Sequence, residues 1–163
     1  MQRNLIYHTG NEKYFRAGKP CAGIVIADEG WKGVSPGHHR TIINNVVKGH
    51  RINLAYWWWD GLDANSCLDN DYIANNTLLD STDIGIEIAS GPKDNVNTII
   101  ENNIISQKSN QLFVGDNNLK GLTFSHNNWS QSVSGIASSP DDVIGDPMTM
   151  GGYQINGDYF RLK

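Results

Sequence analysis

Apolar residues recur along this chain in short runs that are interrupted by pairs of asparagine. Three segments share the frame apolar-x-Asn-Asn-x-apolar: residues 42–47 (IINNVV), 73–78 (IANNTL) and 100–105 (IENNII). Residues 124–129 (FSHNNW) and 1–6 (MQRNLI) fit the same frame with one asparagine replaced. The second asparagine of the frame forms a column with spacings of 41, 31, 27 and 24 residues, which is Asn4, Asn45, Asn76, Asn103 and Asn127. A repeat of this kind indicates units that stack on one another.

A second short segment with alternating apolar positions follows the frames. Its copies are residues 23–26 (GIVI), 51–54 (RINL), 85–88 (GIEI) and 111–114 (QLFV). Alternation with a period of two buries one face of a strand. Because one such repeat cannot cover its own apolar face, the sequence predicts an all-β fold, a parallel β-solenoid of about five coils that each rise about 4.8 Å.

Composition supports strands and turns over helices. The chain has 19 Asn, 17 Ile and 17 Gly among 163 residues, and only 18% of its residues are charged. Ile favours strands, whereas Asn and Gly favour tight turns and left-handed backbone positions. A length of 163 residues fits one domain, residues 1–163, with the coils over about 1–140.

The charge balance and the length of the apolar runs argue against binding to nucleic acid and against insertion into a membrane. Lys plus Arg number 13 against 17 Asp plus Glu, so the net charge of -4 offers no basic surface for nucleic acid. No run approaches the roughly 18 apolar residues of a membrane span, and residues 1–10 lack the pattern of a signal peptide. We therefore expect neither a nucleic-acid nor a membrane partner, and the localisation stays open.

The repeated frames resemble the right-handed parallel β-helix of the pectin-lyase-like superfamily. The closing segment, Ile144-Gly145-Asp146-Pro147 followed by residues 157–162 (GDYFRL), is also similar to the end of such proteins. The resemblance implies a short or truncated right-handed β-helix with a C-terminal cap over residues 141–163, in a family that is mostly extracellular. It does not fix the function, because this architecture carries polysaccharide lyases, glycoside hydrolases, epimerases, phage tailspikes and adhesins.

The asparagine column is expected to be structural. Stacked amides at a turn can satisfy one another and the turn backbone, so Asn45, Asn76, Asn103 and Asn127 are predicted to form a ladder. His126, which replaces an asparagine of the frame, is predicted to be a buried hydrogen-bond partner.

Two long loops, between Ile26 and Ile42 and between Leu54 and Ile73, follow the same strand of successive repeats and are therefore expected to touch. They combine aromatic residues with carboxylates such as Asp28 and Asp71, and a sugar stacks on an aromatic face while polar neighbours take its hydroxyls. The alternative is that the tryptophans cover a small core. The ligand-binding candidates are Trp31, Trp57, Trp58, Trp59, His38 and His39.

Catalysis requires more than stacking. Glycoside hydrolases use paired carboxylates, and lyases commonly combine calcium with an Arg or Lys base. The candidate catalytic residues are Asp60, Asp63, Arg51 and Glu87. We expect no cofactor unless the chain is a lyase, in which case calcium is implied. We also expect no metal at His38 and His39, because neighbouring side chains diverge on an extended chain.

Two functions remain open. The first is a non-catalytic or remnant β-helix module that binds carbohydrate or assembles end to end, and the second is a polysaccharide lyase or glycoside hydrolase. A first coil with exposed strand edges further predicts a homodimer with two-fold symmetry through the N-terminal end. Cys21 and Cys67 are expected to be free thiols.

Overall fold

Strands make up nearly all of the regular structure. The computed structural model describes residues 1–7, 22–28, 37–58, 65–89, 92–107, 112–116, 118–133 and 135–147. The strands are β1 (Leu5–Tyr7), β2 (Ala22–Asp28), β3 (Thr41–Ile43), β4 (Val46–Lys48), β5 (Ile52–Trp58), β6 (Tyr72–Ala74), β7 (Thr77–Leu79), β8 (Ile84–Ile88), β9 (Thr98–Glu101), β10 (Ile104–Ser106), β11 (Leu112–Asp116), β12 (Leu122–Ser125), β13 (Asn128–Trp129) and β14 (Val143–Ile144). Within the described ranges, the one helical segment is the 3₁₀ helix η2 (Gly135–Ala137).

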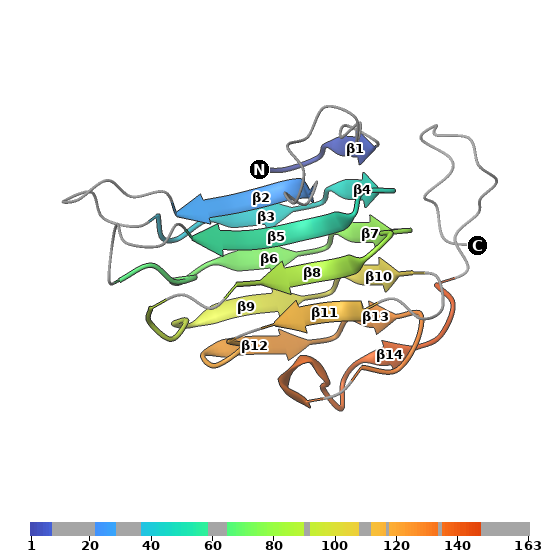
Figure 1. The fold of residues 1–163 in the computed structure, drawn as a ribbon. Coiled ribbons are helices and arrows are strands. Elements are labelled where there is room, and N and C mark those ends of the chain that lie inside the picture. Colours follow the sequence, from blue (N-terminus) through green and yellow to red (C-terminus); the bar gives the residue numbers. More distant parts are fainter. Residues whose placement is uncertain are drawn as a thin grey trace.

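These strands form three sheets that the chain visits in turn. The first sheet has the order β1-β4-β7-β10-β13-β14, the second β2-β5-β8-β11, and the third β3-β6-β9-β12. Figure 1 shows each set stacked in sequence order from the N-terminal end downward. Every strand pair is parallel. The predicted all-β class is therefore confirmed, and the sheets are parallel as expected.

The asparagine frame is two strands and not one. In residues 42–47, β3 ends at Ile43 and β4 begins at Val46, with the Asn44-Asn45 turn between them. Asn44 has a φ of 56°, a left-handed conformation that turns the chain from one sheet into the next. Arg3, Asn75, Asn102 and His126 have φ values of 53–55° at the same position of their frames. Each repeat thus has one strand more than the sequence pattern predicted.

The inward side chains of the three sheets form one apolar core. Ile42, Ile73, Ile100 and Phe124 come from paired positions of the third sheet and are all buried. Such a column of apolar residues at matched positions lets each repeat pack on the next. Trp129, fully buried on β13, closes the core toward its C-terminal end.

A row of buried asparagines runs along the turn between the first and third sheets. We call Asn4, Asn45, Asn76, Asn103 and Asn127 the asparagine row. The Oδ1 atom of each later member accepts two hydrogen bonds from the member before it, one from the backbone N–H and one from Nδ2, over 2.9–3.2 Å. The row therefore has a direction, because every hydrogen bond between two of its members is donated toward the C-terminal end.

Two expectations about side-chain burial are wrong. His126 is exposed, because its left-handed position corresponds to the exposed first asparagine of the frame and not to the buried second one. Burial also fails to alternate in β5, where residues 52–56 are all buried. Asn53 remains inside because its Nδ2 donates to the carbonyl of Leu79 over 3.0 Å.

Replacing an amide within the asparagine row should destabilise the fold. Asn76 is 1% exposed, and its side chain takes part in four hydrogen bonds. Its Oδ1 accepts two from Asn45, and its Nδ2 donates to Oδ1 of Asn103 and to the carbonyl of Ile42. Asn76→Leu should lower the free energy of unfolding by about 1–3 kcal/mol, because buried donors lose their acceptor. Urea unfolding measures this change. The matched control is Asn75→Gly at the exposed left-handed position, which should change stability little, and equal stabilities of the two variants would contradict the structural role of the row.

Candidate functional site

A buried charge network lies where the two long loops return to the sheets. The Nη1 atom of Arg40 pairs with Oδ1 of Asp28 at 3.0 Å, and its Nη2 pairs with Oδ2 of Asp71 at 2.7 Å. The Nε and the backbone N–H of Arg40 both donate to Oδ1 of Asp71, at 3.0 and 2.7 Å. The two carboxylates are 2% and 0% exposed, whereas the Arg40 side chain is 21% exposed. We call Arg40, Asp28, Asp71 and Tyr56 the Arg40 network.

Strand register brings these residues together. Thr41 pairs with Tyr72, so Arg40 and Asp71 immediately precede paired positions of β3 and β6. Asp28 ends β2, and Tyr56 on the neighbouring strand β5 donates its phenol to Oδ2 of Asp28 over 2.9 Å. The network thus joins strands of the second sheet to strands of the third.

Burial and neighbouring charges shift the pKa values of Arg40 and Tyr56 in the network. Burial disfavours the charged guanidinium, but the hydrogen bonds and charges of Asp71 and Asp28 still raise the pKa of Arg40 above its ordinary value. Burial, followed by the hydrogen bond to Asp28, raises the pKa of the Tyr56 phenol far above its ordinary value. Arg40 also lies over the Tyr56 ring, with its guanidinium carbon 5.9 Å from the ring centre. The network therefore holds Arg40 charged and Tyr56 neutral.

The two loops touch as the sequence predicted, within the described part of each. The backbone N–H of His39 donates to the carbonyl of Asp69 at 2.9 Å, and Nη2 of Arg40 donates to the carbonyl of Cys67 at 3.3 Å. The contact differs from the expected one in its chemistry. Asp28 and Asp71 do not edge an aromatic surface, because both carboxylates are buried and neutralised in part by Arg40.

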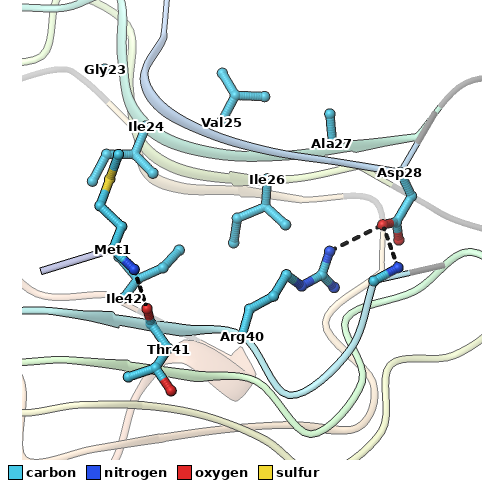
Figure 2. A pocket seen from close by; sticks show the side chains of 11 residues that line it. Met1, Gly23, Ile24, Val25, Ile26, Ala27, Asp28, Arg40, Thr41 and Ile42 are labelled. Carbon is cyan, nitrogen blue, oxygen red and sulfur yellow. Dashed lines mark hydrogen bonds and ion pairs between the residues drawn. The ribbon is translucent and has the colours of Figure 1, made fainter.

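A pocket of about 500 Å³ adjoins the network at the N-terminal end of the sheets. Figure 2 shows Met1, Ile24 and Ile42 at one end of it and Asp28 with Arg40 at the other. Its lining also includes Thr41, whose carbonyl accepts a hydrogen bond from the amino group of Met1 over 2.7 Å. The polar atoms of Asp28 and Arg40 are already engaged with each other and with neighbours. The pocket offers few free polar groups to a sugar.

A second arrangement lies on the outer face of the second sheet. Tyr56 and Ile86 belong to the core, so Trp57 and Glu87, one residue further along β5 and β8, face outward. The indole Nε1 of Trp57 donates to Oε2 of Glu87 over 2.6 Å, and the Trp57 side chain is half-buried. Val25 and Ala27 of β2 lie on this face too, and Figure 2 shows both side chains pointing away from Ile26 and the pocket. An aromatic ring held by a carboxylate thus lies beside small apolar residues.

The other candidate catalytic residues are not brought together with Glu87. Arg51 forms an exposed pair with Asp83, with Nε 3.0 Å from Oδ2. Glu87 lies opposite Ala55, four residues beyond Arg51, which is roughly 13 Å along the strands. Several further candidates lie outside the described residues: Asp60, Asp63, Trp31, Trp59 and the side chain of Trp58.

The two candidate histidines converge, contrary to the expectation that their rings diverge. His39 has a φ of 56°, so the chain is not extended there. The Nδ1 atoms of His38 and His39 lie 2.5 Å apart, and the rings meet edge to face with their centres 4.8 Å apart.

Across the ranges that the structure describes, no three His, Cys, Asp or Glu side chains form a group that could hold a metal ion.

Sequence reasoning did not single out Arg40 and Tyr56. The signal for Arg40 was available, because the frame that aligns Ile42 with Ile73 also aligns Arg40 with Asp71, two opposite charges one repeat apart. Tyr56 had no comparable signal, because the sequence pattern placed it in the loop after Leu54 and not in a strand. Cys67 is a buried free thiol whose pKa is raised by burial, and Cys21 lies outside the described residues.

Comparison with known proteins adds no relative. No family model, no curated protein and no solved structure matches the chain. None of the helical residues in the described ranges forms a helix long and apolar enough to cross a membrane.

Removing the guanidinium should strongly destabilise the protein. Arg40→Met leaves Asp28 and Asp71 buried without their cation, which typically costs about 3–5 kcal/mol of unfolding free energy. The control is Arg51→Met, whose exposed pair with Asp83 should contribute less than about 1 kcal/mol. Urea unfolding of both variants at neutral pH measures the difference. Similar losses in the two variants would contradict a buried network.

Tyr56 should make the protein sensitive to alkali. Its pKa is higher in the folded state than in the unfolded chain, where phenols titrate near about 10. Above that pH the unfolded state releases a proton that the folded state keeps, so unfolding becomes more favourable as pH rises. Melting curves between pH 8 and roughly 11 should show this loss, and Tyr56→Phe should reduce its slope. An identical slope in the variant would mean that Tyr56 ionises normally.

Proposed function

We propose that this chain is a short right-handed parallel β-helix module that binds carbohydrate on the outer face of the sheet of β2, β5, β8 and β11. The stacking of three parallel sheets in a repeated order supports the coiled architecture, since each pass through the sheets adds one strand to each. The resemblance of the asparagine frames to the pectin-lyase-like superfamily supports the right-handed form. Binding modules and enzymes share such architectures, so the site must carry the functional argument.

The pairing of Trp57 with Glu87 carries the proposal. A sugar ring presents an apolar face that packs on indole, and hydroxyls around it that need acceptors. The hydrogen bond from Nε1 to Oε2 fixes the indole, so little side-chain entropy remains to be lost on binding. The second oxygen of Glu87 accepts no hydrogen bond from the described residues, so it can accept one from a ligand hydroxyl. Val25 is 42% exposed beside this pair, which extends the apolar platform along β2.

In our proposal, the outer face of the second sheet binds carbohydrate and does not cleave it. A glycosidase needs two carboxyl groups about 5–10 Å apart, and Glu87 already accepts the Trp57 N–H. Arg51 is committed to Asp83 and lies roughly 13 Å away along the strands, too far to share a proton with Glu87. The enzyme alternative therefore depends on Asp60 or Asp63.

Substitution of the platform tests the proposal. The chain is titrated against a panel of soluble plant and bacterial polysaccharides, followed by intrinsic tryptophan fluorescence and by affinity electrophoresis. Trp57→Ala should weaken binding of any polysaccharide that the wild type retains by roughly tenfold or more, equivalent to about 1.4 kcal/mol. Glu87→Gln keeps the shape but changes the acceptor, so it should give an intermediate loss.

A second aromatic–carboxylate pair provides the matched control. Tyr72 donates its phenol to Oε1 of Glu101 over 2.8 Å on strands of the third sheet. Tyr72→Ala removes a half-buried aromatic side chain of similar setting and should leave binding unchanged. Equal losses in Trp57→Ala and Tyr72→Ala, or no binding by the wild type, would contradict the proposal. New reducing ends or unsaturated products in the same mixtures would favour the enzyme alternative.

A further inference from the structure

The asparagine row ends at an aspartate. The backbone N–H of Asn127, which is the last asparagine of the row, donates to Oδ1 of Asp142 over 2.8 Å. Oδ2 of Asp142 accepts the indole Nε1 of Trp129 at 3.0 Å and the backbone N–H of Ser139 at 2.9 Å. A carboxylate accepts all three hydrogen bonds but has no hydrogen to donate, so the row stops there.

The segment that carries Asp142 repeats the backbone geometry of the earlier repeats. Val143 of β14 pairs with Asn128 of β13 in the same parallel register that joins Leu5 of β1 to Val46 of β4. The N–H of Val143 donates to the carbonyl of Asn127 over 2.8 Å, as the N–H of Val46 does to the carbonyl of Asn4. Residues 142–144 (DVI) thus hold the sixth position of a column whose first position is residues 4–6 (NLI).

The first position of the column has the complementary chemistry. Both hydrogens of the Asn4 side-chain amide are used, by Oδ1 of Asn45 and the carbonyl of Gln2. Its Oδ1 accepts no hydrogen bond from the described residues, and every other asparagine of the row accepts two. Leu5, next to it, is 46% exposed. Among the described residues, the N-terminal end of the row therefore has an acceptor without a donor, and the C-terminal end has a donor, the N–H of Asn127, that Asp142 occupies.

We propose that residues 142–144 are a built-in cap that occupies the docking position for the N-terminal strand of a second copy of this chain. In the absence of the cap, the N–H of Asn127 meets Oδ1 of Asn4 from the second copy, and β1 pairs with β13 as β14 does now. This contact is heterologous, so it would add copies head to tail. It uses the ends of the sheets and is separate from the proposed carbohydrate face.

The direction of the row selects this arrangement over the two alternatives. In a two-fold dimer through the N-terminal ends, the Asn4 Oδ1 atoms of both copies face each other and neither amide has a hydrogen left to donate. A copy stacked on the intact cap would place its Asn4 Oδ1 against the carboxylate of Asp142. The cap also extends one sheet only, since no described strand follows β11 or β12 in the other two, so the three sheets cannot continue evenly past it.

Disrupting the cap should therefore create head-to-tail association. The test compares the full chain with Asp142→Ala by size-exclusion chromatography with light scattering, from micromolar to about millimolar protein. We expect the mean mass of Asp142→Ala to rise with concentration to at least twice that of the wild type. The double variant Asp142→Ala with Asn4→Ala should return to the wild-type mass, because it lacks the acceptor that the second copy supplies.

Two further variants separate the cap from general effects. Asp141→Ala removes the same charge from the neighbouring exposed residue and should behave as the wild type. Val143→Pro removes the N–H that joins β14 to β13 at a residue that is 60% exposed, so it releases the cap even if Asp142→Ala does not fold. The proposal is overturned if folded Val143→Pro keeps the wild-type mass, or if the mass increase persists in the Asn4→Ala background.

Discussion

Satisfaction of the backbone at one buried turn is the constraint on which the rest of this structure depends. Three sheets can enclose a core only if the chain turns sharply between them, and each turn places backbone N–H and carbonyl groups where water cannot reach. The asparagine row supplies the missing partners, because an amide oxygen accepts two hydrogen bonds from the repeat before it. An unsatisfied group of this kind costs about 1–3 kcal/mol, so the turn cannot accept an apolar residue at the buried position.

The Arg40 network supplies partners for buried charged groups, as the asparagine row does for buried backbone groups. Arg40, Asp28 and Asp71 lie at the margins of strands from two sheets, where the long loops begin and end. Two carboxylates beside one guanidinium are costly to bury, yet all of their oxygens accept hydrogen bonds from Arg40, Tyr56 or backbone groups. The network thus connects the ends of the two loops to each other and to the sheets.

Stacked parallel repeats give the molecule two kinds of surface: sheet faces, which present side chains, and ends, which present strand edges. The faces carry side chains at regular spacing, and only the pair of Trp57 and Glu87 combines an indole with a carboxylate among the described outward residues of the second sheet. The ends expose strand edges, which favour pairing with another chain. Because the asparagine row donates in one direction, its two ends are not equivalent, and an acceptor-only residue such as Asp142 can close one of them.

The repeat pattern by itself determined the strand content, the parallel sheets and the column in which Asn45, Asn76, Asn103 and Asn127 stand, because stacked repeats place equivalent positions one above another. It also aligned Arg40 with Asp71, in agreement with the register of β3 and β6. Only the tertiary structure decided that the frame splits at a left-handed residue, that His126 is exposed, and that Asp142 continues a column of asparagines from a different local sequence. The reason is physical: apolar periodicity reports which face of a strand is buried, whereas the partner of a polar group depends on atoms from a distant part of the chain.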